Sequence, residues 1–150
     1  MDVGAAGSWA QMMMERGPAV TESVLCEPSP QAIFNCETRY PEIRAELSVF
    51  EEYQNEDNHF DLITFCSSFY SVTEPMKMLA KINRLLRPGG YLVMCFSNVA
   101  IGLEHWVNGV PWVHMSHLIR GVPTIYYTTQ SYEKFAKLAG FDVIEDFAFE

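Results

Sequence analysis

Small residues and a carboxylate near the start of the chain have the types and spacing of a ligand-binding loop. Residues 2–8 read Asp-Val-Gly-Ala-Ala-Gly-Ser, and a helical pattern follows over residues 9–16. Small side chains let backbone N–H groups at the start of a helix approach a ligand, and a carboxylate at a strand end can orient the ligand's polar groups. The candidate ligand-binding residues here are Asp2, Gly4, Ala5, Ala6 and Gly7.

A second carboxylate stands at the predicted end of the next strand. Glu27 closes the strand predicted over residues 23–27 and precedes Pro28. An acid about 20 residues after a glycine loop is placed to accept hydrogen bonds from both ribose hydroxyls of an adenosine. Enzymes that bind a nicotinamide dinucleotide use such an acid too, so Glu27 alone does not separate the two kinds of cofactor. A solvated loop acid is the structural alternative.

The elements that must position these residues are clearest over residues 60–97. Residues 60–66 are an almost unbroken apolar run, which is typical of a strand buried on both faces of a parallel sheet. A helix is predicted to begin near Pro75, because apolar residues then recur at three- and four-residue spacing. Its apolar stripe consists of Met78, Leu79, Ile82, Leu85 and Leu86. Residues 87–90, Arg-Pro-Gly-Gly, end that helix, and residues 91–96 are the next strand.

This strand, crossover helix and strand form a βαβ unit whose sequence resembles a known family. The phrase FDLITFCSSF, with a helix ending in LLRPGGYLVM, is similar to the strand 4 to strand 5 segment of class I S-adenosylmethionine-dependent methyltransferases. Asp2 and Gly4 match that family's first motif, D-x-G-x-G-x-G. Ala6 and Ser8 stand in place of its later glycines, and Gly7 is displaced by one position.

The resemblance implies a fold, a cofactor and further elements. The implied fold is α/β, a Rossmann-like three-layer αβα sandwich with a mostly parallel sheet that lacks the final antiparallel strand. The implied cofactor is S-adenosyl-L-methionine. Beside the elements above, the pattern predicts a helix over residues 30–40, a strand over residues 47–50, a helix over residues 130–138 and a strand over residues 141–147. Thr128 or Thr129 is expected to cap the last helix, and Gly140 to end it.

The resemblance also implies contacts to the adenine and to the acceptor. After its third strand the family places an acidic or amide residue that reads the adenine amino group, beside an apolar residue that packs on the ring. The candidates are Phe50, Glu51 and Glu52, with a charged surface turn as the alternative. Ser67 and Ser68 follow strand 4 at the carboxyl edge of the sheet, where ligands of open α/β folds bind.

Candidate catalytic residues are Tyr70 and two histidines. Tyr70 stands where many relatives carry a Glu-His pair, and it could donate to a substrate oxygen or pack on the neighbouring helix. Residues 98–127 are the least regular and most aromatic, and we predict a lid over the substrate there. His114 and His117 could act as general base toward an acceptor, since an ordinary histidine pKa near 6.5 suits neutral pH. The spacing identifies no third ligand, so no metal is predicted.

Composition bounds the remaining alternatives. A chain of 150 residues that is 49% hydrophobic suits a single domain spanning residues 1–150. Ten Lys and Arg against 19 Asp and Glu, net −9, leave no basic stripe for a phosphate backbone, which argues against nucleic acid. No apolar run approaches the roughly 18 to 20 residues of a membrane span, and no secretory pattern opens the chain, so we expect a soluble cytoplasmic protein. The four cysteines lack CxxC spacing and are expected to be reduced core residues.

The sequence therefore predicts a methyltransferase that acts on a small-molecule acceptor. Both ends look shortened against the family, because only residues 1–3 remain of the first strand and no sequence remains for the last antiparallel strand. This departure favours an alternative, a non-catalytic domain that acts as a binding or scaffolding partner. Exposed sheet edges predict self-association into a homo-oligomer. A nicotinamide-dependent oxidoreductase is disfavoured by the LRPGG segment and by the lack of GxGxxG.

Overall fold

The computed structural model of the protein describes residues 1–4, 7–16, 20–66, 68–95, 114–119 and 122–144. The predicted site residues Ala5, Ala6 and Ser67 and most of the predicted lid lie outside these ranges. Contacts group the chain into two compact parts, Met1–Phe69 with Arg84–Phe96, and Tyr70–Asn83 with Ser97–Glu150.

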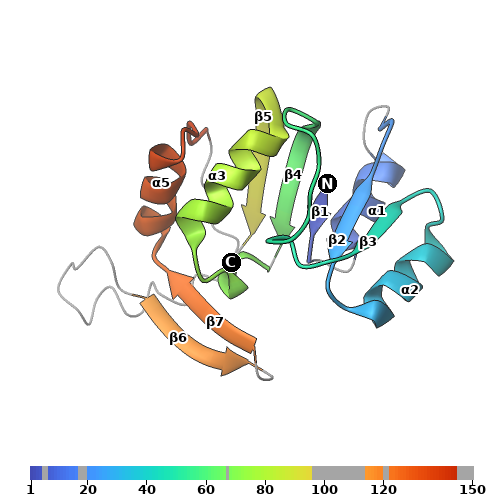
Figure 1. Cartoon of the computed structure of the whole chain (residues 1–150), viewed down its shortest axis with the longest axis horizontal. Coiled ribbons are helices and arrows are strands. Elements are labelled where there is room, and N and C mark those ends of the chain that lie inside the picture. Colours follow the sequence, from blue (N-terminus) through green and yellow to red (C-terminus); the bar gives the residue numbers. More distant parts are fainter. Residues whose placement is uncertain (5–6, 17–19, 67, 96–113, 120–121, 145–150) are drawn as a thin grey trace. The chain divides into compact units, whose positions relative to one another are not determined.

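The first part contains a parallel sheet of five strands in the order β3-β2-β1-β4-β5 (Figure 1). The strands are β1 (Asp2–Val3), β2 (Val24–Glu27), β3 (Arg44–Leu47), β4 (Phe60–Cys66) and β5 (Leu86–Cys95). Successive strands are added on one side from β1 to β3 and on the other side from β4 to β5. The order therefore reverses between β1 and β4, and ligands of open α/β sheets bind beyond the carboxyl ends of the strands at such a reversal.

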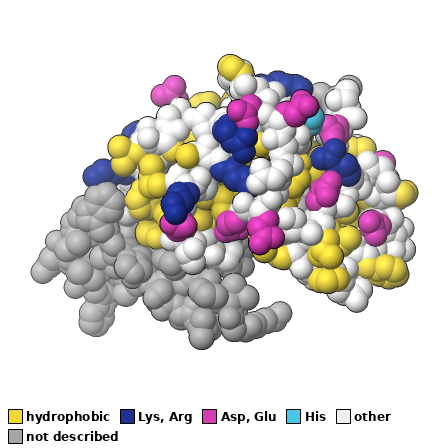
Figure 2. All heavy atoms as spheres, in the orientation of Figure 1, with side chains coloured by type: hydrophobic (Ala, Val, Ile, Leu, Met, Phe, Trp, Pro, Cys, Tyr) yellow, Lys and Arg dark blue, Asp and Glu magenta, His cyan; other side chains and the backbone are white. Residues whose placement is uncertain are grey.

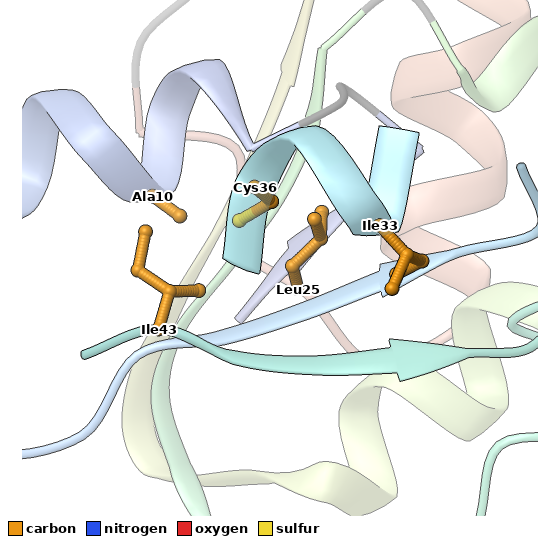
Figure 3. Packing of buried hydrophobic residues seen from close by; sticks show 5 residues of the cluster. All are labelled: Ala10, Leu25, Ile33, Cys36 and Ile43. Atoms are coloured by element: carbon orange, nitrogen blue, oxygen red, sulfur yellow. The ribbon is translucent and has the colours of Figure 1, made fainter. Parts of the chain in front are cut away.

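Two helices of this part share an apolar cluster with β2. Helix α1 (Ser8–Arg16) follows β1, and α2 (Pro30–Arg39) follows β2, with the Ser29 hydroxyl accepting a hydrogen bond from the Ala32 N–H at 3.3 Å. Figure 3 shows the side chains of the cluster pointing toward one another between the two helices and the sheet. They are Ala10, Leu25, Ile33, Cys36 and Ile43.

The third strand lies three residues earlier than its apolar letters predict. Instead of residues 47–50, the structure places β3 at Arg44–Leu47, paired in parallel with β2. As an edge strand of the described sheet, β3 tolerates charge, because Arg44 contacts Glu22 at 3.0 Å and Glu46 at 3.3 Å. Leu47 is 59% exposed, so apolarity did not mark this strand.

Residues 87–90, predicted to form a turn before a strand at residues 91–96, instead belong to β5, because its pairing with β4 already begins at Leu86 and has an irregularity before Tyr91. Gly90 has a steric role there. A Cβ on Gly90 would lie 2.9 Å from the Arg87 carbonyl oxygen and 3.2 Å from that of Asp61, so only glycine fits without a shift. The Arg87 guanidinium contacts both carboxylate oxygens of Asp61 at 2.8 Å. The FDL phrase of β4 and the RPGG phrase at the start of β5 are thus joined by an ion pair.

The second part contains a hairpin and a capped helix. Helix α3 (Pro75–Leu85) buries the predicted stripe, with Leu79, Ile82 and Leu85 fully buried. Leu86, predicted as part of this stripe, is instead the first residue of β5. Strands β6 (His114–Ile119) and β7 (Val122–Tyr127) pair antiparallel, so this stretch is more regular than expected. Helix α5 (Thr129–Leu138) is capped by Thr128, whose hydroxyl accepts from the Ser131 N–H at 3.2 Å. The short helix η1 (Phe69–Ser71) spans the boundary between the two parts.

The end of α5 and the segment after it settle two further predictions. Gly140 has φ +87°, and the Phe141 N–H donates to the Ala136 carbonyl at 3.0 Å, which is a Schellman ending. The strand predicted over residues 141–147 is wrong for residues 141–144, which form no strand, and residues 145–147 lie outside the described ranges. An alternating pattern of apolar and polar residues forms a strand only where a partner strand pairs with it. Ile144 is 78% exposed, so its side chain is not covered by the sheet.

Charged side chains are interspersed on the face shown in Figure 2, where Lys and Arg lie beside Asp and Glu. Several of the basic residues pair with carboxylates, among them Arg44 with Glu22 and Arg84 with Asp57. None of the helices within the described residues has the length and apolarity needed to cross a membrane.

The cluster of Figure 3 makes a testable contribution to stability. Leu25 is fully buried, so Leu25→Ala should lower the free energy of unfolding by about 2–5 kcal/mol. Leu47→Ala, at an exposed position of the neighbouring strand, should cost less than about 1 kcal/mol. Urea unfolding followed by circular dichroism measures both, and equal losses would contradict this assignment of the core.

Candidate functional site

The carboxyl ends of β1, β2 and β4 lie at one edge of the sheet. Val3 of β1 is the register partner of Cys26 in β2, and the Gly4 N–H donates to the Cys26 carbonyl at 2.9 Å. On the other side of β1, the Ser68 hydroxyl donates to the Val3 carbonyl at 2.5 Å. Gly4, Glu27 and Ser68 thus lie at the same edge, around the point where the strand order reverses.

Gly4 and Gly7 allow the loop after β1 to pass close to its neighbours. Gly4 has φ +68°, and a Cβ there would lie 2.8 Å from the Ser68 Cβ. Gly7 has φ +81°, and its Cβ would lie 3.2 Å from the Cys36 Sγ. The Gly7 carbonyl accepts from the Gln11 N–H at 2.9 Å, so α1 begins directly after it. The glycine that looks displaced in the sequence motif is therefore required by its own backbone conformation and neighbours.

Asp2 is buried and bonded within the protein. It is 2% exposed, its Oδ1 accepts from the Thr64 hydroxyl at 2.8 Å, and its Oδ2 accepts from the Ala10 N–H at 3.2 Å. Burial raises the pKa of Asp2, and these hydrogen bonds partly oppose the rise. In this structure Asp2 joins β1 to β4 and to the first turn of α1. A direct contact of Asp2 with a ligand stays a prediction.

Glu27 is held in place at the end of β2. Its side chain is largely buried, and Oε1 accepts from the Ser29 N–H at 2.9 Å. The Glu27 carbonyl also accepts from the Ser48 N–H at 3.2 Å, which fixes the backbone on the β3 side. A fixed carboxylate beside a glycine loop can accept hydrogen bonds from a pair of hydroxyls.

The residues predicted to face an adenine lie just beyond β3. Phe50 is 4% exposed and packs edge-to-face on Phe65, with ring centroids 5.2 Å apart, and parallel to Tyr53 at 6.2 Å. Glu51 and Glu52 are exposed. Phe50 thus belongs to an aromatic cluster beside the sheet edge, and the adenine role of all three residues stays a prediction.

The structure says less about the predicted catalytic residues. Tyr70 lies in η1, and His114 and His117 lie in β6, but their side chains are outside what the structure describes. Their roles stay predictions. In the described part of the chain, no group of three or more His, Cys, Asp or Glu could hold a metal ion.

Sequence reasoning missed Thr64 and the contact made by Ser68. Thr64 is a buried hydroxyl within the apolar strand β4, and it is the register partner of Asp2. Its polar side chain inside that run was the only signal, and the partner could not be found without the register. The hydroxyl of Ser68, which follows β4, donates to the Val3 carbonyl of β1, and the predicted cofactor contact of Ser68 stays a prediction.

Comparison with known proteins assigns the family. The model of a family described as a methyltransferase domain matches residues 1–94. The chain belongs to this methyltransferase domain family. The resemblance to class I S-adenosylmethionine-dependent methyltransferases is thereby confirmed, and S-adenosylmethionine is the cofactor of this class. A curated relative, the ubiquinone/menaquinone biosynthesis C-methyltransferase UbiE of Psychromonas ingrahamii, is 48% identical over 44 residues. That match covers 29% of this chain and 18% of the relative's length.

Solved structures share the fold of this methyltransferase domain. An S-adenosylmethionine-dependent methyltransferase from Mesorhizobium loti has a TM-score of 0.76 at 15% identity, over 96% of this chain and 74% of that one. A putative S-adenosylmethionine-dependent methyltransferase from Listeria monocytogenes has a TM-score of 0.77 at 13% identity, over 96% of this chain and 76% of that one. The predicted Rossmann-like α/β fold is confirmed.

The residues at the sheet edge fit a molecule of this kind. S-adenosylmethionine carries an adenosine, whose ribose offers two hydroxyls to a carboxylate acceptor, and Glu27 supplies one at the end of β2. The loop around Gly4 leaves no room for a Cβ next to Ser68, so its backbone can lie close to the strand ends. The donor set of the site is therefore compatible with an adenosine.

The role of Gly4 can be tested against a matched glycine. Gly4→Ala should lower the free energy of unfolding by roughly 1–2 kcal/mol, the cost of placing alanine in a left-handed conformation. The loss should be larger still, because the added Cβ would lie 2.8 Å from the Ser68 Cβ. Gly89 has φ +81°, and nothing lies within 4 Å of the Cβ that Gly89→Ala would add, so this variant should lose only the stability that the backbone conformation costs. Urea unfolding compares the two variants, and a smaller loss for Gly4→Ala would contradict the close approach.

The raised pKa of Asp2 predicts a pH dependence. Below the ordinary pKa of 3.8 the carboxyl is protonated whether the chain is folded or not, so it adds no penalty. As the pH rises through the raised folded-state pKa, the ionised form is penalised only in the folded chain. The stability of Asp2→Asn relative to wild type should therefore increase from pH 4 upward, as measured by urea unfolding at several pH values. Parallel pH curves would contradict the burial of this charge.

Proposed function

We propose that this chain binds S-adenosylmethionine at the carboxyl edge of β1, β2 and β4 and transfers its methyl group to a small-molecule acceptor. The observation that carries the proposal is the position of Glu27 beside Gly4, on adjacent strand ends next to the reversal of strand order. The family supplies the reaction type, because the matching model is that of a methyltransferase domain.

The proposed roles follow from the contacts. Glu27 accepts hydrogen bonds from the ribose hydroxyls, since its carboxylate is fixed by the Ser29 N–H. Backbone near Gly4 approaches the cofactor, and the bonds of Asp2 with Thr64 and of Val3 with Ser68 hold the preceding strand β1 in place. Phe50, Glu51 and Glu52 are the proposed adenine contacts.

Methyl transfer requires mainly that the protein orient the cofactor and the acceptor. When bound, S-adenosylmethionine supplies an electrophilic methyl group for in-line displacement by an oxygen, nitrogen or carbon nucleophile. Orientation of the two reactants provides most of the rate in such a reaction, and a dedicated base is optional. We propose Tyr70, His114 and His117 as the residues that bind the acceptor or take its proton.

The hairpin of the second part supports a substrate lid within residues 98–127. Tyr127, the last residue of β7, packs edge-to-face on Tyr132 and Phe135 of α5, with centroids 5.6 Å and 5.2 Å away. These contacts anchor one end of the hairpin to a capped helix. Aromatic surfaces with few polar groups suit small organic acceptors, and we propose that the lid forms one domain with the sheet.

The curated relative also supports a small-molecule acceptor. Its name describes a C-methyltransferase of ubiquinone and menaquinone biosynthesis, although only 18% of its length is matched. The net charge of −9 is consistent with an acceptor other than nucleic acid. We also propose that the protein is cytoplasmic and that copies of the chain associate through the edges of the sheet.

Replacement of one carboxylate tests the cofactor site. Glu27→Gln should weaken S-adenosylmethionine binding about tenfold to a hundredfold, because a charge-assisted hydrogen bond contributes about 1.5–3 kcal/mol. Glu37→Gln, at an exposed position on α2, is the matched control and should bind as the wild type does. Isothermal titration calorimetry with S-adenosylmethionine and with its demethylated product measures both.

The same titration separates the methyltransferase from a scaffold. A non-catalytic domain should give no saturable heat with either compound, whereas the proposed enzyme binds both. Unchanged affinity in Glu27→Gln would overturn the site map while leaving the family intact. Incubation with labelled cofactor and small-molecule pools then identifies acceptors by transfer of the label.

A further inference from the structure

Two free cysteines lie opposite each other where β4 and β5 end. Cys66 is the last residue of β4, Cys95 is the last residue of β5, and the two are direct partners in the parallel register. Neighbouring strands lie about 4.8 Å apart, within the range of Cα separations that a disulfide can join.

The two thiols differ in their access to solvent. Cys66 is buried, and Cys95 is partly exposed. Burial raises the pKa of the Cys66 thiol, and the neighbouring Cys95 raises it further. Cys66 is therefore held as the neutral thiol, and Cys95 is the sulfur that a reagent from solvent meets first.

We propose that Cys66 and Cys95 are a modification site, a dithiol that small-molecule disulfides such as oxidised glutathione convert to an intramolecular disulfide. The Cys95 thiolate attacks one sulfur of the reagent, breaks its disulfide and releases one glutathione thiol. Cys66 then gives up its proton and attacks the Cys95 sulfur of the mixed disulfide, which releases the second glutathione. The two electrons of the dithiol pass to the reagent, and the two protons pass to the released thiols.

Closure of this disulfide would act on the proposed cofactor edge, so the coupling rests on the proposed function. Disulfide-linked Cβ atoms lie about 3.8 Å apart, about 1 Å less than the spacing of neighbouring strands. β4 lies between β5 and β1. Drawing the end of β4 toward β5 moves it away from β1, where Ser68 bonds to Val3 and contacts Gly4. Oxidation therefore loosens the loop that the cofactor needs.

Mass spectrometry tests the modification site on the whole chain. After incubation of the folded protein with oxidised glutathione, the mass should fall by two hydrogen atoms, and digestion should show the peptides of Cys66 and Cys95 linked. Cys66→Ser should stop at a glutathione adduct on Cys95, and Cys95→Ser should form no internal disulfide. Cys26→Ser, which keeps a donor near the Ser48 carbonyl, is the control and should still form the bridge. A different pairing, or no bridge, overturns the proposal.

Calorimetry tests the coupling separately. The oxidised protein should bind S-adenosylmethionine about tenfold more weakly than the reduced protein, which is the loss expected from about one hydrogen bond, and dithiothreitol should restore binding. Equal affinity of both forms overturns the coupling but not the bridge. Absence of binding by the reduced protein overturns the proposed function, and the mass measurement still decides the modification site.

Discussion

The geometry of this domain depends on a buried carboxylate. Asp2 accepts hydrogen bonds from Thr64 in β4 and from Ala10 in the first turn of α1, and it is 2% exposed. A buried charge is costly unless it is hydrogen-bonded, so these two contacts specify how β1, β4 and α1 must meet. The arrangement fixes the positions of β1 and α1, between which the loop runs, and it also fixes the end of β1 next to β4.

Periodicity and capping chemistry were enough to predict most elements from the sequence. β4 reads as a buried apolar run, α3 as a regular stripe, and the last helix as a Thr128 cap with Gly140 after its end. β3 was misplaced because its neighbour on the sheet, rather than its own apolarity, defines it. The strand expected over residues 141–147 failed at residues 141–144 for the same reason, since a pattern does not supply a partner.

The candidate site was predictable in position but not in its contacts. Parallel strands end at one edge, so a loop after the first strand and an acid after the second had to lie close together. Which polar groups point inward depends on register between segments far apart in sequence, as with Asp2 and Thr64 or Val3 and Ser68. Nothing in the local sequence reveals that Ser68 bonds to a neighbouring strand.

Side-chain hydrogen bonds add to the pairing of β1 with β4 at this edge. β1 has two residues, and its ladder with β4 contains one register pair, Asp2 with Thr64. Met1 extends this pairing, because its terminal amine donates to the Leu62 carbonyl at 2.8 Å and its carbonyl accepts from the Thr64 N–H at 2.9 Å. The side-chain bonds from Thr64 and Ser68 each add about 1 kcal/mol net to these contacts. β4 and β5, by contrast, pair along most of their length. The end of β4 is therefore held by a long backbone ladder on its β5 side and by a few backbone bonds together with the side-chain bonds of Thr64 and Ser68 on its β1 side, so those two hydroxyls matter more there.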